Sequence, residues 1–167
     1  MDADAKKTAL RMIPYGIYVL TAKAADGTLA AATVNWVTQT AFEPPLVAIG
    51  VKADSGAYGI LKETGHFTLN MLGKGQQNTA FAFFKPTERD GETINGHGYT
   101  EGANGAPILD DAHASIECRV AEIVERGDHH VVLGEGVAAR VARAPAGRPD
   151  EAILEMKDLG EKVFYGG

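Results

Sequence analysis

The chain has 167 residues, of which 45% are hydrophobic and 23% are charged, as in an ordinary globular protein with its own core. A net charge of −6 and a pI near 5.3 argue against nucleic acid or an anionic membrane as the main partner. The single Cys118 excludes an internal disulfide, and neither a leader peptide nor a membrane-spanning apolar run is evident. We therefore expect one cytoplasmic domain, residues 1–167.

The first third of the chain predicts one helix and three strands. Residues 3–12 have an amphipathic helical pattern, which Pro14 stops. Residues 16–37 predict two strands that are joined around Asp26-Gly27, a strong hairpin signal. Residues 44–52, PPLVAIGVK, are almost continuously apolar, so we expect this strand to be buried on both faces.

The middle of the chain predicts two helices around one strand. Residues 55–65 predict a helix in which Ser55 is the N-cap and Gly65 the stop. Residues 66–72 alternate between apolar and polar side chains, as a half-buried strand does. Residues 75–84 then predict a second short helix.

The last part of the chain predicts a long surface excursion followed by a hairpin. Residues 85–106 are rich in Gly, Asn, Thr and charge, and an excursion of this length is usually functional or mobile. Residues 114–128 and 129–143 predict two long strands, and residues 149–167 predict a short helix with an aromatic end. Several strands with turns between them and two or three short helices indicate an antiparallel barrel.

Polar side chains crowd the strand-like residues 30–40, beside the only tryptophan in the chain. If this stretch is one strand, Thr33, Asn35, Val37 and Gln39 share a face. The amide of Asn35 and the ring of Trp36 could then hold a flat heteroaromatic molecule. An edge strand with a solvated polar face explains the same pattern.

Two further features have both a functional and a structural interpretation. Lys52 ends a strand and Ser55 begins a helix, an arrangement that can bind a phosphate or can be a simple N-cap beside a surface lysine. His129 and His130 are adjacent on a strand, so they point to opposite faces and cannot hold one metal ion. One of them can line a pocket. We expect no metal site.

Several stretches, taken in order, resemble the flavin reductase-like domain family. They are ALRMIPYGIYVLTAK at 9–23, AAATVNWVTQTAFEPPLVAIGVKADS at 30–55, GHFTLNML at 65–72, NGAPIL at 104–109 and GDHHVVLGEG at 127–136. Within the family the chain looks closest to flavoredoxin and to the flavin reductase domain of flavodiiron proteins. The resemblance implies a mainly β fold, an antiparallel Greek-key split barrel that binds FMN and carries two or three short flanking helices.

The resemblance also implies a set of site residues. Thr33, Val34, Asn35 and Trp36 would surround the flavin ring and its ribityl chain, with Thr38 and Gln39 nearby in the same segment. Ser55 and Lys52 would bind the FMN phosphate, and Lys85 would be a basic residue near the flavin. His129 would face the flavin and the incoming nicotinamide, and Phe164 would cover the ring.

By the same resemblance the protein is expected to be a flavin reductase that transfers a hydride from NADH or NADPH to FMN. Reduced flavin would pass its electrons to a monooxygenase or a redox protein, and the protein would be a homodimer. One alternative is a flavoredoxin-like carrier that a protein donor reduces. Another is a non-catalytic module that holds flavin.

Overall fold

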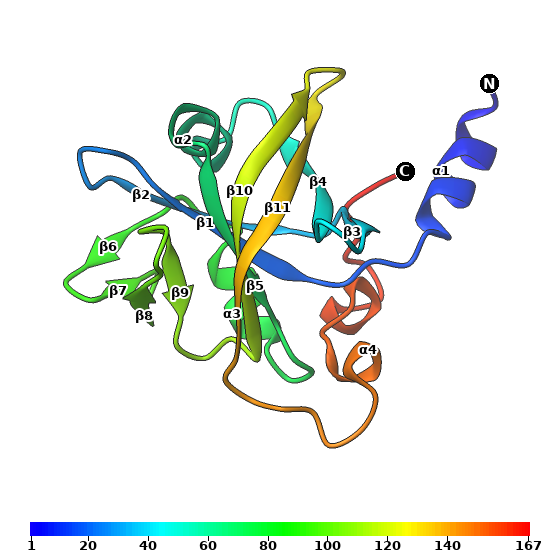
Figure 1. Ribbon diagram of the computed structural model, residues 1–167. Coiled ribbons are helices and arrows are strands. Elements are labelled where there is room, and N and C mark those ends of the chain that lie inside the picture. The colour runs from blue at the N-terminus through cyan, green and yellow to red at the C-terminus, as the bar shows by residue number, and fades with distance from the viewer.

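A computed structural model describes residues 1–167, and its main element is an antiparallel sheet of seven strands (Figure 1). The strands follow one another across the sheet in the order β2-β1-β5-β10-β11-β4-β3. Their bounds are β1 (Tyr18–Lys23), β2 (Leu29–Val34), β3 (Val37–Ala41), β4 (Leu46–Lys52), β5 (His66–Met71), β10 (Ala114–Val124) and β11 (His129–Val141). The two edge strands, β2 and β3, are consecutive in the chain. The sheet must therefore roll up until its edges nearly meet, which confirms the predicted antiparallel barrel.

The remaining elements cover the barrel from outside. A second sheet of four short strands contains β6 (Arg89–Asp90), β7 (Thr93–Ile94), β8 (His97–Glu101) and β9 (Pro107–Leu109). The helices are α1 (Ala3–Arg11), α2 (Gly56–Thr64), α3 (Gln77–Ala82) and α4 (Pro149–Ala152), with a 3-10 turn at Met156–Leu159. No helix is long and apolar enough to cross a membrane.

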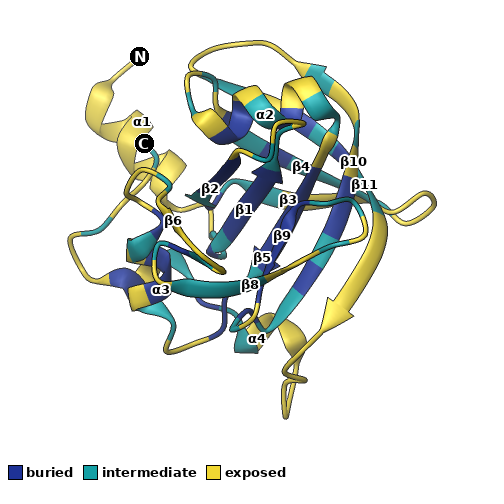
Figure 2. Cartoon of the chain, turned by 90° about the vertical axis from the view of Figure 1, so that its left-hand side faces the viewer, coloured by how far each residue is buried: buried dark blue, intermediate teal, exposed yellow.

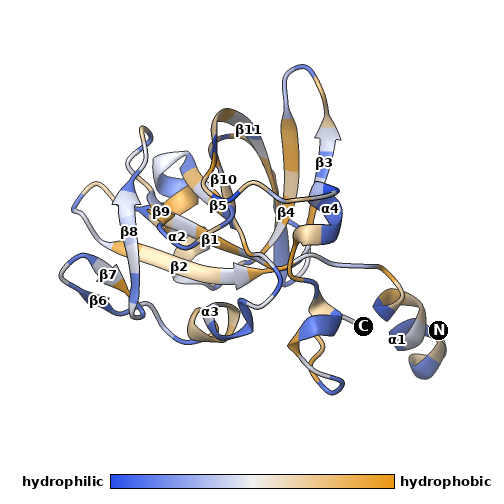
Figure 3. Cartoon of the chain, turned by 90° about the horizontal axis from the view of Figure 1, so that it is seen from below, coloured by the Kyte–Doolittle hydropathy of each residue, from blue (hydrophilic) through white to orange (hydrophobic).

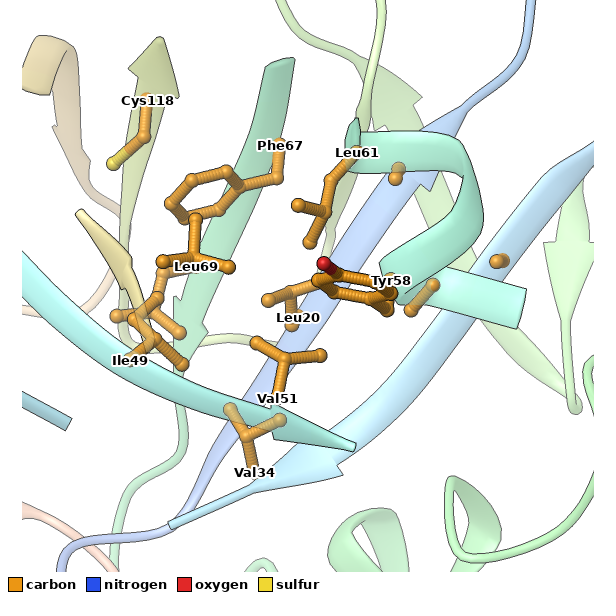
Figure 4. Close-up of a cluster of buried hydrophobic side chains, with 13 residues drawn as sticks. Leu20, Val34, Ile49, Val51, Tyr58, Leu61, Phe67, Leu69 and Cys118 are labelled. Atoms are coloured by element: carbon orange, nitrogen blue, oxygen red, sulfur yellow. The ribbon is translucent and has the colours of Figure 1, made fainter. Parts of the chain in front are cut away.

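The hydrophobic core has two parts, one on each side of the β1–β2 hairpin. The inner part fills the barrel with side chains from β1, β2, β4, β5, β10 and β11, and α2 closes one end (Figure 4). Phe67, Leu69 and Ile49 are fully buried there. The outer part lies between the hairpin and α3, the small sheet and the C-terminal segment. Figure 2 shows this burial in the central strands.

The local turn and cap signals predicted the backbone well. The β1–β2 hairpin turns at Asp26-Gly27, where Gly27 has a φ of 88°. Ser55 caps α2 by accepting a hydrogen bond from the Tyr58 amide, and Gly65 ends the helix in the left-handed conformation. The strand at β5, the helix at α3 and the β10–β11 hairpin are also present.

Two predictions about strands were wrong. Residues 30–40 are not one strand, because β2 ends at Val34 and β3 begins at Val37 on the opposite edge of the sheet. The chain needs the two intervening residues to cross the gap between the edges. The apolar β4 is also not buried on both faces: only Ile49 and Val51 are buried. A strand in an antiparallel barrel turns one face inward, and its other face remains partly accessible.

The excursion at 85–106 is more ordered than its composition predicts. It contains β6, β7 and β8, and Ile94 is fully buried in the outer core. The Thr87 hydroxyl accepts a hydrogen bond from the Ala31 amide, which attaches the start of the excursion to β2. Gly91 and Gly96 have positive φ values at the turns between these short strands. The sequence here has no period-two pattern that would have predicted the strands.

The N-terminal helix α1 is present as predicted, but none of its residues is buried. It stands away from the barrel and lies beside the C-terminal end of the chain (Figure 3). Arg11 makes this contact: its guanidinium lies 4.2 Å from the centre of the Phe164 ring, and its Nε donates to the Gly166 carbonyl. The two ends of the chain therefore meet.

Gly134 of β11 is a test of the inner packing. A Cβ at this position would lie 2.5 Å from Cζ of the fully buried Phe67 and 3.2 Å from Cβ of Cys118. We expect Gly134→Ala to lower the free energy of unfolding by about 1–3 kcal/mol, because the ring has no space into which it can move. Urea titration followed by circular dichroism measures this change.

Gly59 provides the matched control, since it lies in α2 with no atom within 4 Å of a new Cβ. Gly59→Ala should stabilise the protein by about 0.5–1 kcal/mol, because alanine is the better helix former. Equal effects of the two substitutions would contradict the packing described for Phe67.

Candidate functional site

A cavity of about 320 Å³ lies at the seam where the rolled sheet fails to close. Its lining comes from the ends of β1, β2 and β4, the start of α2 and β11, the segment after α3, and the C-terminal tail. The lining residues are Ile17, Ala32, Thr33, Val34, Asn35, Gly50, Val51, Lys52, Ser55, Phe83, Phe84, His129, Met156, Val163, Phe164 and Tyr165. Several of the residues proposed from sequence therefore meet here from separate parts of the chain.

The walls of the cavity are mainly apolar, with polar groups at defined places. Thr33 is held by α3, because its hydroxyl donates to the Ala80 carbonyl at 2.7 Å. Asn35 is buried, and its side-chain Nδ2 donates to the Tyr165 carbonyl at 3.0 Å. Apolar walls with a few oriented polar groups are typical of a site for a flat organic molecule.

One end of the cavity suits an anion. Lys52 and Ser55 line it where β4 leads into α2, and the first amides of a helix have no intrahelical acceptor. The Ser55 hydroxyl donates to the Lys52 carbonyl, so the loop between them is tightly folded. Asp54 lies 3.0 Å from the Lys52 ammonium, and this contact raises the pKa of the lysine. An incoming anion would compete with Asp54 for that ammonium.

His129 faces the cavity from the start of β11. Its Nδ1 lies 3.0 Å from a carboxylate oxygen of Asp128, and its Nε2 lies 2.7 Å from the Tyr165 hydroxyl. The Nδ1–H donates to Asp128, a bond that lowers the pKa of this carboxyl. Nε2 is then the acceptor that the ring presents to the cavity.

His130 points to the other side of β11, as the strand alternation predicted. Its Nδ1 lies 2.6 Å from the Tyr58 hydroxyl, which itself donates to Glu125. Glu125 also pairs with Lys62, so this cluster ties α2 to the β10–β11 hairpin. The two neighbouring histidines thus belong to different environments.

Trp36 lies behind the cavity rather than in its lining. Its ring centre is 4.6 Å from that of His129 and 5.5 Å from that of Tyr165. A Cβ on Gly50 would lie 3.0 Å from the indole, so glycine is what allows the ring to lie against β4. The indole Nε1 is buried and has no hydrogen-bond partner.

Besides Trp36, three other residues proposed from sequence lie outside the lining. Thr38 and Gln39 are exposed on β3, because the chain crosses to the other sheet edge after Trp36. Lys85 is exposed, although the preceding Phe83 and Phe84 do line the cavity. No three His, Cys, Asp or Glu side chains are grouped so that they could hold a metal ion.

Of the C-terminal residues that line the cavity, the sequence predicted only Phe164. Met156, Val163 and Tyr165 line the cavity beside the proposed Phe164. No local pattern announces these contacts, since the tail after Leu159 has no regular secondary structure. An aromatic pair at 164–165 beside glycines was the available signal, and it did not identify which ring faces the barrel.

Residues 10–155 match the family model described as flavin reductase like domain. Among curated proteins, the chain is 32% identical over 145 residues to diflavin flavoprotein A 1 of Synechocystis, covering 86% of this chain and 25% of that protein. It is 31% identical to a flavin reductase (NADH) of Kitasatospora aureofaciens, covering 83% and 72%. The chain spans less than two thirds of the length of the first curated relatives it matches.

A solved structure gives the same relationship in three dimensions. The styrene monooxygenase flavin reductase of Pseudomonas putida S12 superposes with a TM-score of 0.71 at 27% identity. The match covers 82% of this chain and 87% of that one. The split-barrel fold is therefore shared over nearly the whole of the relative.

Proposed function

The chain belongs to the flavin reductase-like domain family, and from this we propose that residues 1–167 act as one flavin-dependent reductase domain. The proposed reaction is hydride transfer from NADH or NADPH to FMN. Relatives named as flavin reductases and as reductase components of monooxygenases support this reaction class. One observation of the site carries the proposal: a single cavity joins apolar walls, a histidine acceptor and a cationic end.

The residues around the cavity fit FMN in their chemistry. Val34, Phe84 and Val163 offer apolar surface to a fused ring, and Asn35 offers an amide with both a donor and an acceptor. Lys52, Ser55 and the first turn of α2 offer charge and donors to a phosphate. Trp36 lies behind the cavity and packs against His129 and Tyr165, which line it. We propose that Thr33 contacts the edge of the flavin ring, as the sequence suggested.

Bound FMN would supply the redox chemistry, since a flavin can take a hydride from a nicotinamide and later give up the two electrons and the proton. The protein's part is to orient the two rings and to exclude water. We propose that His129 orients the nicotinamide through Nε2, since Asp128 fixes the imidazole by accepting a hydrogen bond from Nδ1–H. No side chain has to move a proton for the hydride to pass.

Partner and location also remain proposals. A monooxygenase or redox protein is proposed as the acceptor, supported by relatives named as reductase components. A homodimer is proposed because Val131, Val137 and Val141 are exposed along β11 and Phe42 is 90% exposed beside β3. A cytoplasmic location is proposed from the single, buried Cys118, whose pKa burial raises to about 12.

Anaerobic titration tests the proposed reaction. We expect the purified protein to bind FMN and the bound flavin to lose its colour on addition of NADH or NADPH. The preferred nicotinamide is the one that bleaches at the lower concentration. Bleaching only by a reduced protein donor would favour the carrier, and binding without turnover would favour a flavin-holding module. Failure to bind any flavin would reject the family function for this chain.

The cationic end predicts a difference between FMN and riboflavin, which lacks the phosphate. We expect a Lys52→Ala, Ser55→Ala double variant to weaken FMN about tenfold and riboflavin much less, because it removes charge and donors that only the phosphate uses. Asp54→Asn is the opposite control and should strengthen FMN alone, since it frees the Lys52 ammonium. Equilibrium fluorescence quenching measures the affinity of the wild type and of both variants for FMN and riboflavin. Equal losses of affinity for the two ligands in the double variant would refute the phosphate role.

The paired histidines predict a difference in kinetics. His129→Ala should slow nicotinamide oxidation at least about tenfold while weakening flavin less, because Nε2 faces the cavity. His130→Ala is matched in residue type and strand but faces Tyr58, so it should change stability by about 1 kcal/mol and leave the kinetics near wild type. Stopped-flow absorbance separates these effects. Normal rates for His129→Ala would remove this residue from the site.

A further inference from the structure

Two polar groups at the seam are bonded to the C-terminal tail, residues 163–167. The Asn35 amide donates to the Tyr165 carbonyl, and the His129 Nε2 is bonded to the Tyr165 hydroxyl. The unpartnered indole Nε1 of Trp36 is covered by Gly166, where a Cβ would lie 3.6 Å from it. These are the groups through which the seam would recognise a flat polar ring.

Tyr165 resembles such a ring in its chemistry. Its aromatic ring contacts Trp36 and His129, with centres 5.5 and 5.6 Å away. Partial burial raises the pKa of its phenol, which therefore stays protonated and donates to Nε2 of His129. The Tyr165 side chain thus occupies the His129 acceptor, and the main-chain carbonyl of the same residue occupies the Asn35 donor, as an external ligand would.

The tail has room to leave. A second cavity of about 500 Å³ lies on its other side, lined by Arg11, Ile13, Tyr15 and Lys157 among others. Both cavities share the same wall, made by Met156, Val163, Phe164 and Tyr165. Movement of this wall would enlarge the first cavity at the expense of the second.

Few interactions hold the tail in its place. It has no regular secondary structure; Gly166 within it has a φ of 134°, and Gly160, three residues before the tail, has a φ of 132°. Outside the seam its anchor is Arg11 of α1, which lies over the Phe164 ring and bonds to the Gly166 carbonyl. The anchor therefore lies on the side of the second cavity, away from the seam.

We propose that Tyr165 is an internal competitor of the flavin, so that the tail sets how tightly the flavin is held. This inference rests on the proposed function. In the ligand-free protein the tail occupies Asn35 and His129, and flavin binds as the tail moves toward the second cavity. The apparent affinity is then the intrinsic affinity multiplied by the fraction of molecules whose tail is open.

The test compares flavin affinity in four variants, one of them a control, by fluorescence quenching. Tyr165→Ala should bind FMN about three- to tenfold more tightly, because it removes one modest hydrogen bond and the ring contacts from the closed form while the Asn35 bond to the main-chain carbonyl remains. Tyr165→Phe keeps the ring and loses the His129 bond, so its gain should be smaller. Arg11→Gln, which acts only through the anchor, should also tighten FMN, whereas Arg140→Gln on the far end of β11 should not.

A ligand-free measurement separates this inference from the proposed function. Trp36 is the only tryptophan, so its emission should change in Tyr165→Ala without any ligand, and added FMN should speed hydrogen exchange of amides 163–166 in the wild type. Unchanged or weaker FMN binding by Tyr165→Ala would overturn the competition while leaving the reductase intact. A different outcome would reject the proposed flavin reductase function itself. In that case the wild-type protein would bind no flavin and its tail would stay protected from exchange, so competition for flavin would be rejected as well.

Discussion

The crossing of the chain from one sheet edge to the other at Asn35 and Trp36 is the constraint on which the site depends. β2 pairs with β1 and β3 pairs with β4, so the two strands belong to opposite edges of one sheet, although only two residues join them. The edges must approach, but the two strands do not pair with each other, and the seam remains open. The Trp36 carbonyl accepts from the Gly50 amide, which fixes the crossing against β4. A cavity at this position is therefore a consequence of how the sheet closes.

The same constraint explains which parts of the fold the sequence could predict. Turns and caps depend on a few neighbouring residues, and the hairpin at Gly27 and the helix between Ser55 and Gly65 were predicted from them. The break at Asn35 was not predictable in this way, because its polar alternation continues without a glycine or proline. Only the closure of the whole sheet requires the strand to stop there.

The site residues also fall into those that the sequence predicted correctly and those that it did not. Thr33 and Lys52 lie near the ends of β2 and β4, and His129 begins β11. The family resemblance assigned all three to the site, and all three line the cavity. Thr38 and Gln39 were placed by assuming one continuous strand, and they follow the other edge away from the cavity. Tyr165 reaches the seam from 36 residues beyond His129 without any periodic pattern, so only the folded chain brings the two together.

The charge balance of the site makes moderate flavin affinity a reasonable outcome of this architecture. The chain carries a net charge of −6, and Lys52 is the one lysine or arginine in the cavity lining, already paired with Asp54. A dianionic phosphate would thus be attracted by one ammonium and one helix start. Asp54, which is already paired with that ammonium, would weaken the attraction. The proposed competition by the tail would lower affinity for the flavin ring at the opposite end of the same cavity. If the protein hands reduced flavin to a separate enzyme, as proposed, release matters as much as binding, and both ends of this cavity would then limit how tightly the cofactor is held.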